Sequence, residues 1–260
     1  MARAARYSPN SEQRDAALLQ AVAQRLSRWA EVQTVGEDDG SLPRADVYVS
    51  MARSGPMLDA LRQAERRGAL VLNSSRGVRL ACRRWQLRAL LAGHGVPLPP
   101  DEGSAGYWVK RADEPSQTAL DVQYAGSREQ ADRIVAHMRA RGVGRTVVEA
   151  HVAGDVVKFY GVAGTGFFRC YYPADDGQTK FGDELRFGPP RHHAFCLGLM
   201  RQTAARAARL ARLAIYGGDC VVRADGTFVL IDLNDFPSFS RCRDEAAEAI
   251  ARCVRMQTER

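Results

Sequence analysis

The chain has 260 residues, of which 45% are hydrophobic and 26% are charged, and its formal net charge at pH 7 is +7. This length accommodates one or two domains with a buried core. The sequence has no run of eighteen apolar residues and no apolar amino-terminal segment, so we expect neither a membrane partner nor a signal peptide. The six cysteines form no C-x-x-C pair, which argues against zinc and disulfide frameworks and fits a cytoplasmic protein.

The positive charge does not by itself indicate a nucleic-acid partner, because the arginines are spread along the chain rather than clustered. We therefore predict no nucleic acid and attribute part of the charge to a cleft for anionic substrates. Only three basic residues are lysines, namely Lys110, Lys158 and Lys180. Because lysine is a compact point charge that suits phosphate, each of them is a candidate phosphate or substrate contact.

In the first third of the chain, helical and strand-like patterns alternate. A helix is predicted from Ser11 to about Trp29, where apolar residues recur at helical spacing. Further predicted elements are strands at 32–35, 47–49 and 69–73, a helix at 56–67 and helical pieces at 77–93. The alternation predicts a small parallel α/β lobe. The prolines that follow Gly95 mark a domain boundary.

The rest of the chain has a similar mixture of elements. Predicted strands lie at 107–111, 146–152, 156–162 and 167–172, and predicted helices at 128–141, 192–213 and 244–256. Residues 173–190 lack periodicity and are polar and glycine-rich, and irregular loops of this length are often functional in enzymes.

A hairpin near the carboxyl end carries the most specific chemical signal. Asp225-Gly226 predicts a tight turn between a strand that begins at Asp219 and a strand from Phe228 to Leu233. Alternation places Asp232 and Asn234 on one face, and antiparallel pairing brings Asp219 close to them. Three oxygen ligands then converge, which suits Mg²⁺.

The alternative is a surface hairpin with solvated acids. However, Asp232 lies between Ile231 and Leu233, and an unpaired buried carboxylate is costly. A bound metal ion would remove that cost, so we favour a functional site.

The order of motifs resembles that of the ATP-grasp superfamily over residues 45–254. The resemblance rests on four segments: the linker from Val71 to Pro99, the strand with Val109-Lys110, the hinge from Val147 to Asp155, and the metal hairpin. It implies an α/β ATP-grasp fold with a short amino-terminal parallel α/β lobe. We expect this lobe and a linker helix at 1–96, a small ATP-grasp lobe at 97–155, and a carboxy-terminal lobe with the metal site at 156–260.

The resemblance also implies cofactors and roles. ATP and Mg²⁺ are the expected cofactors, with Mn²⁺ as a possible substitute. The implied nucleotide contacts are Lys110 at the α- and β-phosphates, Glu149 and the backbone of Ala150, His151 and Val152 at adenine, and Asp155 near the ribose. The implied metal ligands are Asp219, Asp232 and Asn234, and Lys158 is placed to reach the terminal phosphate or the substrate.

The chain departs from the family pattern at two places. The family often has lysine where this chain has Arg84, although arginine can also contact phosphate. The glycine-rich lid expected after Lys110 is absent.

The substrate end of the site is expected near the irregular loop and after the metal ligands. Lys180 and Arg186 are candidate catalytic groups, together with Lys158, and further substrate candidates are Arg169, Arg191, Ser238 and Ser240.

Two likenesses within the superfamily leave the reaction open. The layout resembles the ribosomal-protein glutamate ligases and the glutathione-synthetase-like enzymes, which implies an ATP-dependent ligase that joins a carboxylate to an amine or thiol through an acyl phosphate. The end, from Ile231 to Pro237, is more similar to the inositol polyphosphate kinases, which implies phosphorylation of a polyol phosphate. A nucleotide-binding protein without catalysis is a third possibility. Small-molecule or peptide carboxylates and amines are the expected substrates, and the family often forms homodimers.

Overall fold

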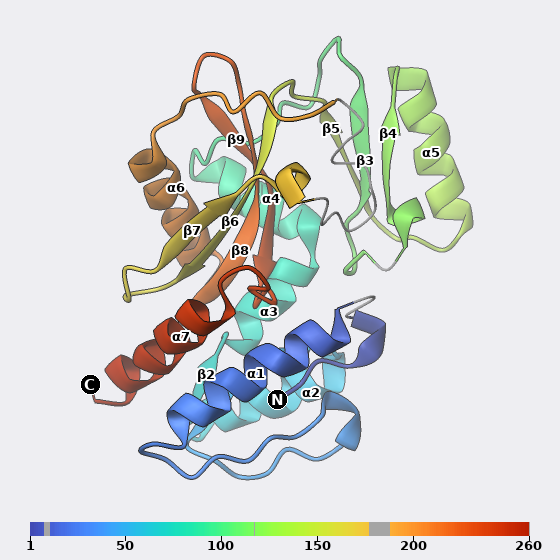
Figure 1. Cartoon of the computed structure of the whole chain (residues 1–260). Coiled ribbons are helices and arrows are strands. Elements are labelled where there is room, and N and C mark those ends of the chain that lie inside the picture. The colour runs from blue at the N-terminus through green and yellow to red at the C-terminus, as the bar shows by residue number, and fades with distance from the viewer. Residues whose placement is uncertain (8–10, 117, 177–187, 260) are drawn as a thin grey trace.

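Figure 1 shows the computed structural model, which describes residues 1–7, 11–116, 118–176 and 188–259. Three sheets, with strand orders β1-β2, β4-β3-β5 and β7-β6-β8-β9, follow one another along the chain. Within the described ranges, no helix combines the length and the apolar character needed to cross a membrane.

The amino-terminal lobe is the small parallel α/β unit that the sequence predicts. Strands β1 (Val47–Val49) and β2 (Leu70–Leu72) pair in parallel, and α2 (Gly55–Arg66) connects them. The predicted strand at 32–35 is wrong, because these residues are irregular and Val32 is 37% exposed. A strand needs a neighbour for its backbone groups, and a single bridge between Ala2 and Gly36 is the only one formed nearby in the described chain.

The second sheet is antiparallel and has β3 (Tyr107–Arg111) at its centre. Strand β5 (Thr146–Ala150) flanks it on one side and β4 (Val122–Ala125), which the sequence did not predict, on the other. Helix α5 (Arg128–Ala140) covers one face through a compact apolar core. Two further helices, α3 (Ser75–Cys82) and α4 (Arg84–Gly93), lead into this sheet.

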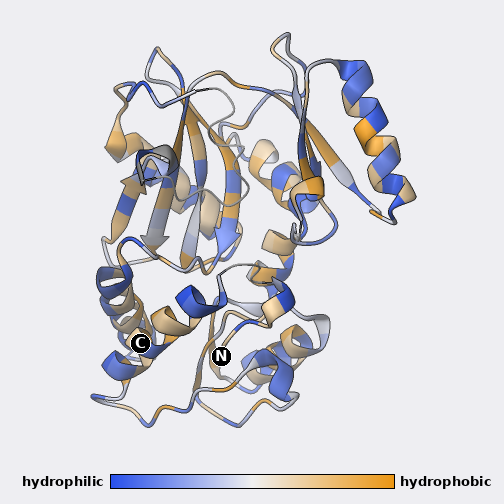
Figure 2. Ribbon diagram, turned by 45° about the vertical axis from the view of Figure 1, so that its right-hand side comes forward, coloured by the Kyte–Doolittle hydropathy of each residue, from blue (hydrophilic) through white to orange (hydrophobic). Residues whose placement is uncertain are grey.

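The third sheet is antiparallel throughout. Its strands are β7 (Phe168–Tyr171), β6 (Asp155–Val162), β8 (Ile215–Val222) and β9 (Phe228–Asp235). Helix α6 (Leu197–Leu210) packs on one face of this sheet, and Figure 2 shows hydrophobic and hydrophilic residues along both the strands and the helices. Strand β8 begins four residues before the predicted start, because glycine at 218 lets β8 approach β9: a Cβ there would lie 2.2 Å from the Asp232 carbonyl oxygen.

Helix α1 (Glu12–Leu26) packs beside α7 (Arg243–Thr258), so opposite ends of the chain share one core (Figure 1). Leu18 and Ile250 are fully buried in it. The boundaries expected at 96/97 and 155/156 remain a prediction, although each sheet falls within one expected segment apart from Asp155, the first residue of β6.

Replacing Ile250 with alanine should lower the free energy of unfolding by about 2–5 kcal/mol, because it leaves a cavity in this shared core. Urea denaturation of the wild type and the variant measures the loss. Met256→Ala on the same helix is the matched control, since Met256 is 37% exposed, and its effect should stay below about 1 kcal/mol. Equal losses in the two variants would contradict the α1–α7 core.

Candidate nucleotide and metal site

A β-bulge in the hairpin of β8 and β9 directs Asp232 into a cavity. Asp219 lies opposite Asp232 across β8 and β9, but the next pair joins Cys220 to Leu230, so Ile231 is an extra residue on β9. The bulge interrupts the alternation of faces. Leu230 therefore stays in the core under α6, whereas Ile231 and Asp232 both line the cavity.

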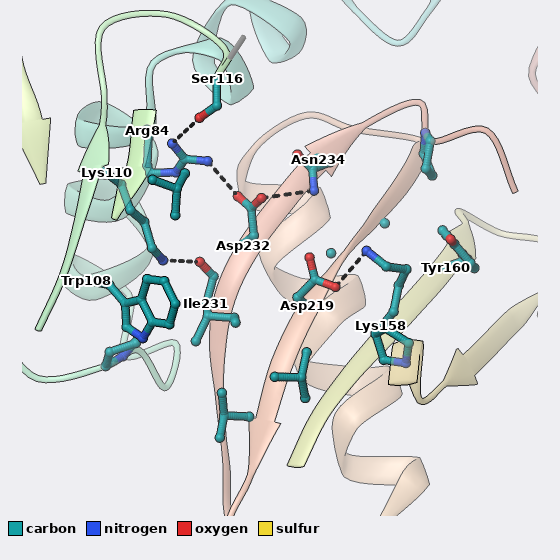
Figure 3. Close-up of a pocket in the computed structure, with 18 of the residues that line it drawn as sticks. Arg84, Trp108, Lys110, Ser116, Lys158, Tyr160, Asp219, Ile231, Asp232 and Asn234 are labelled. Carbon is teal, nitrogen blue, oxygen red and sulfur yellow. Dashed lines mark hydrogen bonds and ion pairs between the residues drawn. The ribbon is translucent and has the colours of Figure 1, made fainter. Parts of the chain in front are cut away.

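Asp219 is held by a lysine from the neighbouring strand. Lys158 on β6 pairs with Asp219 in register, and its Nζ lies 2.8 Å from the Asp219 carboxylate (Figure 3). Burial acts to lower the pKa of Lys158, but the Asp219 carboxylate raises it, and the net result is a pKa well above the usual value. Lys158 therefore stays charged at neutral pH, and the structure brings together Lys158 and Asp219, which the sequence analysis named separately as site candidates.

Asp232 is surrounded by cations and an amide. The Arg84 guanidinium lies 3.5 Å from one carboxylate oxygen, and the Asn234 side chain donates to the other at 3.2 Å. Burial acts to raise the pKa of Asp232, but Arg84 and then Lys110 lower it, and the net shift is downward. The carboxylate is therefore ionised at neutral pH, as a metal ligand has to be.

Lys110 on β3 connects the second sheet to strand β9 of the third sheet. Its Nζ donates to the Ile231 carbonyl at 2.9 Å (Figure 3). The same Nζ lies 2.6 Å from the Glu149 carboxylate. Arg88, a residue on α4 that sequence reasoning missed, binds the other Glu149 oxygen at 2.8 Å and Asp101 at 2.6 Å. Arg88 thus fixes Glu149 beside the linker into the second sheet.

Arg84 occupies the position at which the family often has lysine. It donates to the Arg111 carbonyl at 2.6 Å and lies near the Ser116 hydroxyl at 3.4 Å, in addition to its contact with Asp232. It therefore faces the same charged centre as Lys110, which suits a phosphate contact.

One cavity of about 790 Å³ is lined by the charged groups of this centre and Asn234, namely Arg84, Lys110, Glu149, Lys158, Asp219, Asp232 and Asn234. The end of the cavity near Val152, Val221 and Ile231 is apolar. The amides of Ala150 and His151 already donate to protein carbonyls at 2.8 Å. Among the described residues the Val152 amide has no hydrogen-bond acceptor, unlike the amides of Ala150 and His151, and the contact of this segment with adenine stays a prediction.

His151 packs against aromatic side chains. Its Nδ1 accepts a hydrogen bond from the Trp108 indole at 3.2 Å, and its ring meets Tyr124 edge-on. Burial lowers the pKa of His151, which keeps the ring neutral at pH 7.

Asp155 lines the cavity and holds a loop beside it, while its predicted place near the ribose stays a prediction. Its two carboxylate oxygens accept the backbone amides of Arg191 and His193, both at 2.7 Å, and Asp155 is 4% exposed. Residues 188–191 and His193 line the cavity, so Asp155 fixes one wall of it.

The structure separates the remaining substrate candidates. Ser238, Ser240 and Arg191 line the cavity as expected. Arg169 does not, because its guanidinium pairs with Glu245 at the start of α7. Lys180 and Arg186 lie outside the described residues.

Sequence reasoning also missed the contribution of the amino-terminal lobe. Arg53 binds the carboxylate of the buried Asp235 at 2.5 and 3.3 Å, and Asp235 directly follows the candidate metal ligand Asn234. Arg3 donates to the Phe236 carbonyl at 2.9 Å. Asp235 adjacent to Asn234 was a visible signal, but its partners are 182 and more residues away in the chain.

The donor set fits Mg²⁺. No group of three or more His, Cys, Asp or Glu within the described ranges is arranged to hold a metal ion, so an amide has to complete the set. Asp219, Asp232 and Asn234 supply two carboxylates and an amide, which are the hard oxygen donors that Mg²⁺ and Mn²⁺ take. The Asn234 amide now donates to Asp232, and rotating it would present its oxygen.

Comparisons with known proteins agree with this arrangement. No protein-family model and no curated protein matches the sequence. Among solved structures, a RimK-domain ATP-grasp protein from Sphaerobacter thermophilus matches with a TM-score of 0.63 and 16% identity, over 91% of this chain and 95% of that one. D-alanyl-alanine synthetase A from Vibrio cholerae matches with a TM-score of 0.64 and 12% identity, over 94% of each chain.

A third structure, D-cycloserine synthetase, matches with a TM-score of 0.61 and 18% identity, over 90% of this chain and 92% of that one. These similarities establish that the chain has the ATP-grasp fold, and the resemblance found in the sequence is confirmed at this level. At such identities the similarity establishes the fold alone.

Asp155→Ala should release the loop that Asp155 holds. Loss of two hydrogen bonds to a carboxylate, each worth about 1.5–3 kcal/mol, predicts amide hydrogen exchange in residues 188–196 that is faster by at least roughly tenfold. Mass spectrometry of the exchanged peptides measures this without any ligand. Asp132→Ala on α5 is the control and should leave these amides unchanged, and protection that survives Asp155→Ala would contradict the loop contact.

Proposed function

We propose that the protein is an ATP- and Mg²⁺-dependent ligase that joins a carboxylate to an amine or thiol. The observation that carries the proposal is the charged centre of the cavity. Two carboxylates face each other across β8 and β9, with Lys110, Lys158 and Arg84 around them, next to an apolar end beside the hinge.

Each of these groups has a role in phosphoryl transfer. Bound Mg²⁺, held by Asp219, Asp232 and Asn234, would neutralise phosphate charge during the transfer. Lys110 and Arg84 are placed on the side of the second sheet, where they would hold the inner phosphates. Lys158 lies on β6 of the third sheet, beside Asp219, where it would contact the terminal phosphate. We keep Lys180 and Arg186 as candidate catalytic groups of the irregular loop.

The proposed reaction has two steps. A substrate carboxylate oxygen attacks the γ-phosphorus of ATP, which forms an acyl phosphate and releases ADP. The amine or thiol then attacks the acyl carbon, inorganic phosphate leaves, and the nucleophile gives up its proton. Positioning and charge neutralisation supply most of the catalysis, which is what a cavity lined by fixed cations provides.

The charge balance of the cavity favours a ligase over a polyol phosphate kinase. Among the described residues, eight Lys and Arg line the cavity, and so do seven Asp and Glu. Residues 177–187 contain two basic and two acidic residues and change nothing in this balance. Each phosphate brings roughly 1.5–2 negative charges, so a polyphosphorylated acceptor would have no excess of cations to meet it.

The kinase alternative rests on the similarity of Ile231–Pro237 to inositol polyphosphate kinases. The non-catalytic alternative conflicts with the complete set of Asp219, Asp232 and Asn234. We further propose small-molecule or peptide substrates for the ligase, and a homodimer as its assembly.

Asp232→Asn should reduce Mg²⁺-dependent ADP formation by at least ~100-fold, because it removes one of the two charged ligands at the centre of transfer. Coupled ADP detection over a Mg²⁺ titration measures it. Asp225→Asn in the exposed turn between the same strands is the matched control and should retain activity. If Asp232→Asn and Lys110→Ala both bind ATP as the wild type does, the assignment of this site is wrong.

Product mass separates the ligase from the kinase. With Mg²⁺-ATP and pooled carboxylates and amines or thiols, the ligase should give ADP, phosphate and a product equal to the sum of the substrates minus water. Mass spectrometry of pools with and without the amine or thiol reads this directly. A product heavier by one phosphoryl group, formed from a polyol phosphate pool, would establish the kinase instead.

A further inference from the structure

The acidic residues are distributed far less evenly than the arginines. Two stretches, residues 66–100 and 185–218, contain thirteen arginines and not a single Asp or Glu. The other residues therefore carry 24 Lys and Arg against all 30 Asp and Glu. The positive net charge of the chain belongs to these two stretches, and the rest of the chain is acidic.

The two acid-free stretches pack against each other through α3, α4 and α6. The Ser74 hydroxyl at the start of α3 donates to the Arg212 carbonyl at 3.1 Å, just beyond the end of α6. Arg206 of α6 donates to the His94 carbonyl at the end of α4. Helix α6 covers the sheet face opposite the one that carries Lys158 and Asp219 (Figure 1). This side of the molecule is therefore separate from the cavity.

The outer side of α6 carries exposed arginine and leucine side chains. Leu199, Arg206 and Arg209 follow one another at spacings of seven and three residues, which places them on one helix face. Leu197 and Arg201, four residues apart, are exposed at the edge of this face, and Arg212 is exposed just beyond the end of α6. None of these four arginines forms an ion pair with a carboxylate of a described residue, whereas Arg79, Arg84 and Arg88 on α3 and α4 do.

Two leucines accompany the arginines. Leu197 and Leu199, in the first turn of α6, are 53% and 54% exposed. Phosphate groups make no favourable contact with leucine side chains. Protein interfaces, in contrast, combine arginine with apolar side chains and contain little lysine. The combination distinguishes a protein partner from a nucleic-acid backbone.

We propose that the outer face of α6, formed by Leu197, Leu199, Arg201, Arg206, Arg209 and Arg212, binds an acidic segment of another protein that also carries apolar side chains. A symmetric dimer through this face is excluded, because it would bring like charges together. The partner binds on the side opposite the cavity, so it leaves the proposed nucleotide site open.

The test uses a fluorescently labelled synthetic helix in which glutamates and leucines share one side. Anisotropy should show binding at low salt that weakens as salt screens the charges. Arg201→Gln/Arg206→Gln/Arg209→Gln should weaken binding by at least ~10-fold, since three ion pairs of about 0.5–1 kcal/mol are lost. Arg28→Gln/Arg133→Gln/Arg139→Gln removes the same charge elsewhere on the surface and should change binding by less than about twofold.

A further variant with two substitutions tests the contribution of the leucines. Leu197→Ser/Leu199→Ser should also weaken binding of the helical probe by at least roughly tenfold, because two exposed leucines that the probe would cover no longer contribute apolar area. Circular dichroism confirms that each variant is folded. Equal loss in both arginine variants would reduce the effect to net charge and overturn the proposal.

Two further outcomes also overturn it. One is no binding of the probe to the wild type at low salt. The other is duplex DNA or RNA that binds more tightly than the probe and is unaffected by Leu197→Ser/Leu199→Ser, which would assign the face to nucleic acid.

Discussion

Two carboxylates that face each other across β8 and β9 are the constraint on which the site depends. Like charges at such close range raise the free energy of the folded chain unless cations compensate them. Lys158 meets Asp219 from one side, and Arg84 and Lys110 meet Asp232 from the other. Lys158 comes from the third sheet, Lys110 from the second sheet and Arg84 from helix α4. Compensating the charge of the two carboxylates therefore also fixes how the two sheets and this helix are arranged.

The amino-terminal lobe contributes to the same arrangement through Asp235. Glu37, which is 5% exposed, accepts the amides of Ala4, Arg53 and Ser54, and thereby holds the segment that presents the Arg53 side chain. Arg53 then binds Asp235, which is the last residue of β9. A lobe that appears peripheral in Figure 1 is thus connected by buried charges to the residue that follows Asn234. Buried groups of this kind are costly to leave unpaired, which makes the connection specific.

Local sequence signals predicted much of the fold and of the site. The hairpin acids were predicted because their spacing along the chain is short and their chemistry is distinctive. The lysine of β3 was predicted because the chain has only three lysines, and the hinge because the order of motifs resembles that of a known family. The bulge at Ile231 was not predictable, since only pairing with β8 defines it. Arg88 and Arg53 were missed because their partners are 61 and 182 residues away. Arg169 looked like a substrate contact only while its partner Glu245, on another element, was unknown.

The position of Trp108 has a consequence for how occupancy of the site can be observed. Trp108 lies on β3 two residues before Lys110, lines the cavity and donates its indole N–H to His151 at the hinge. The other two tryptophans, Trp29 and Trp85, are 44% and 38% exposed and do not line the cavity. A nucleotide that filled the proposed site would change the surroundings of Trp108, which is the one tryptophan that lines the cavity. The chain thus carries its own optical reporter, so its intrinsic fluorescence can follow filling and emptying of the cavity without a label.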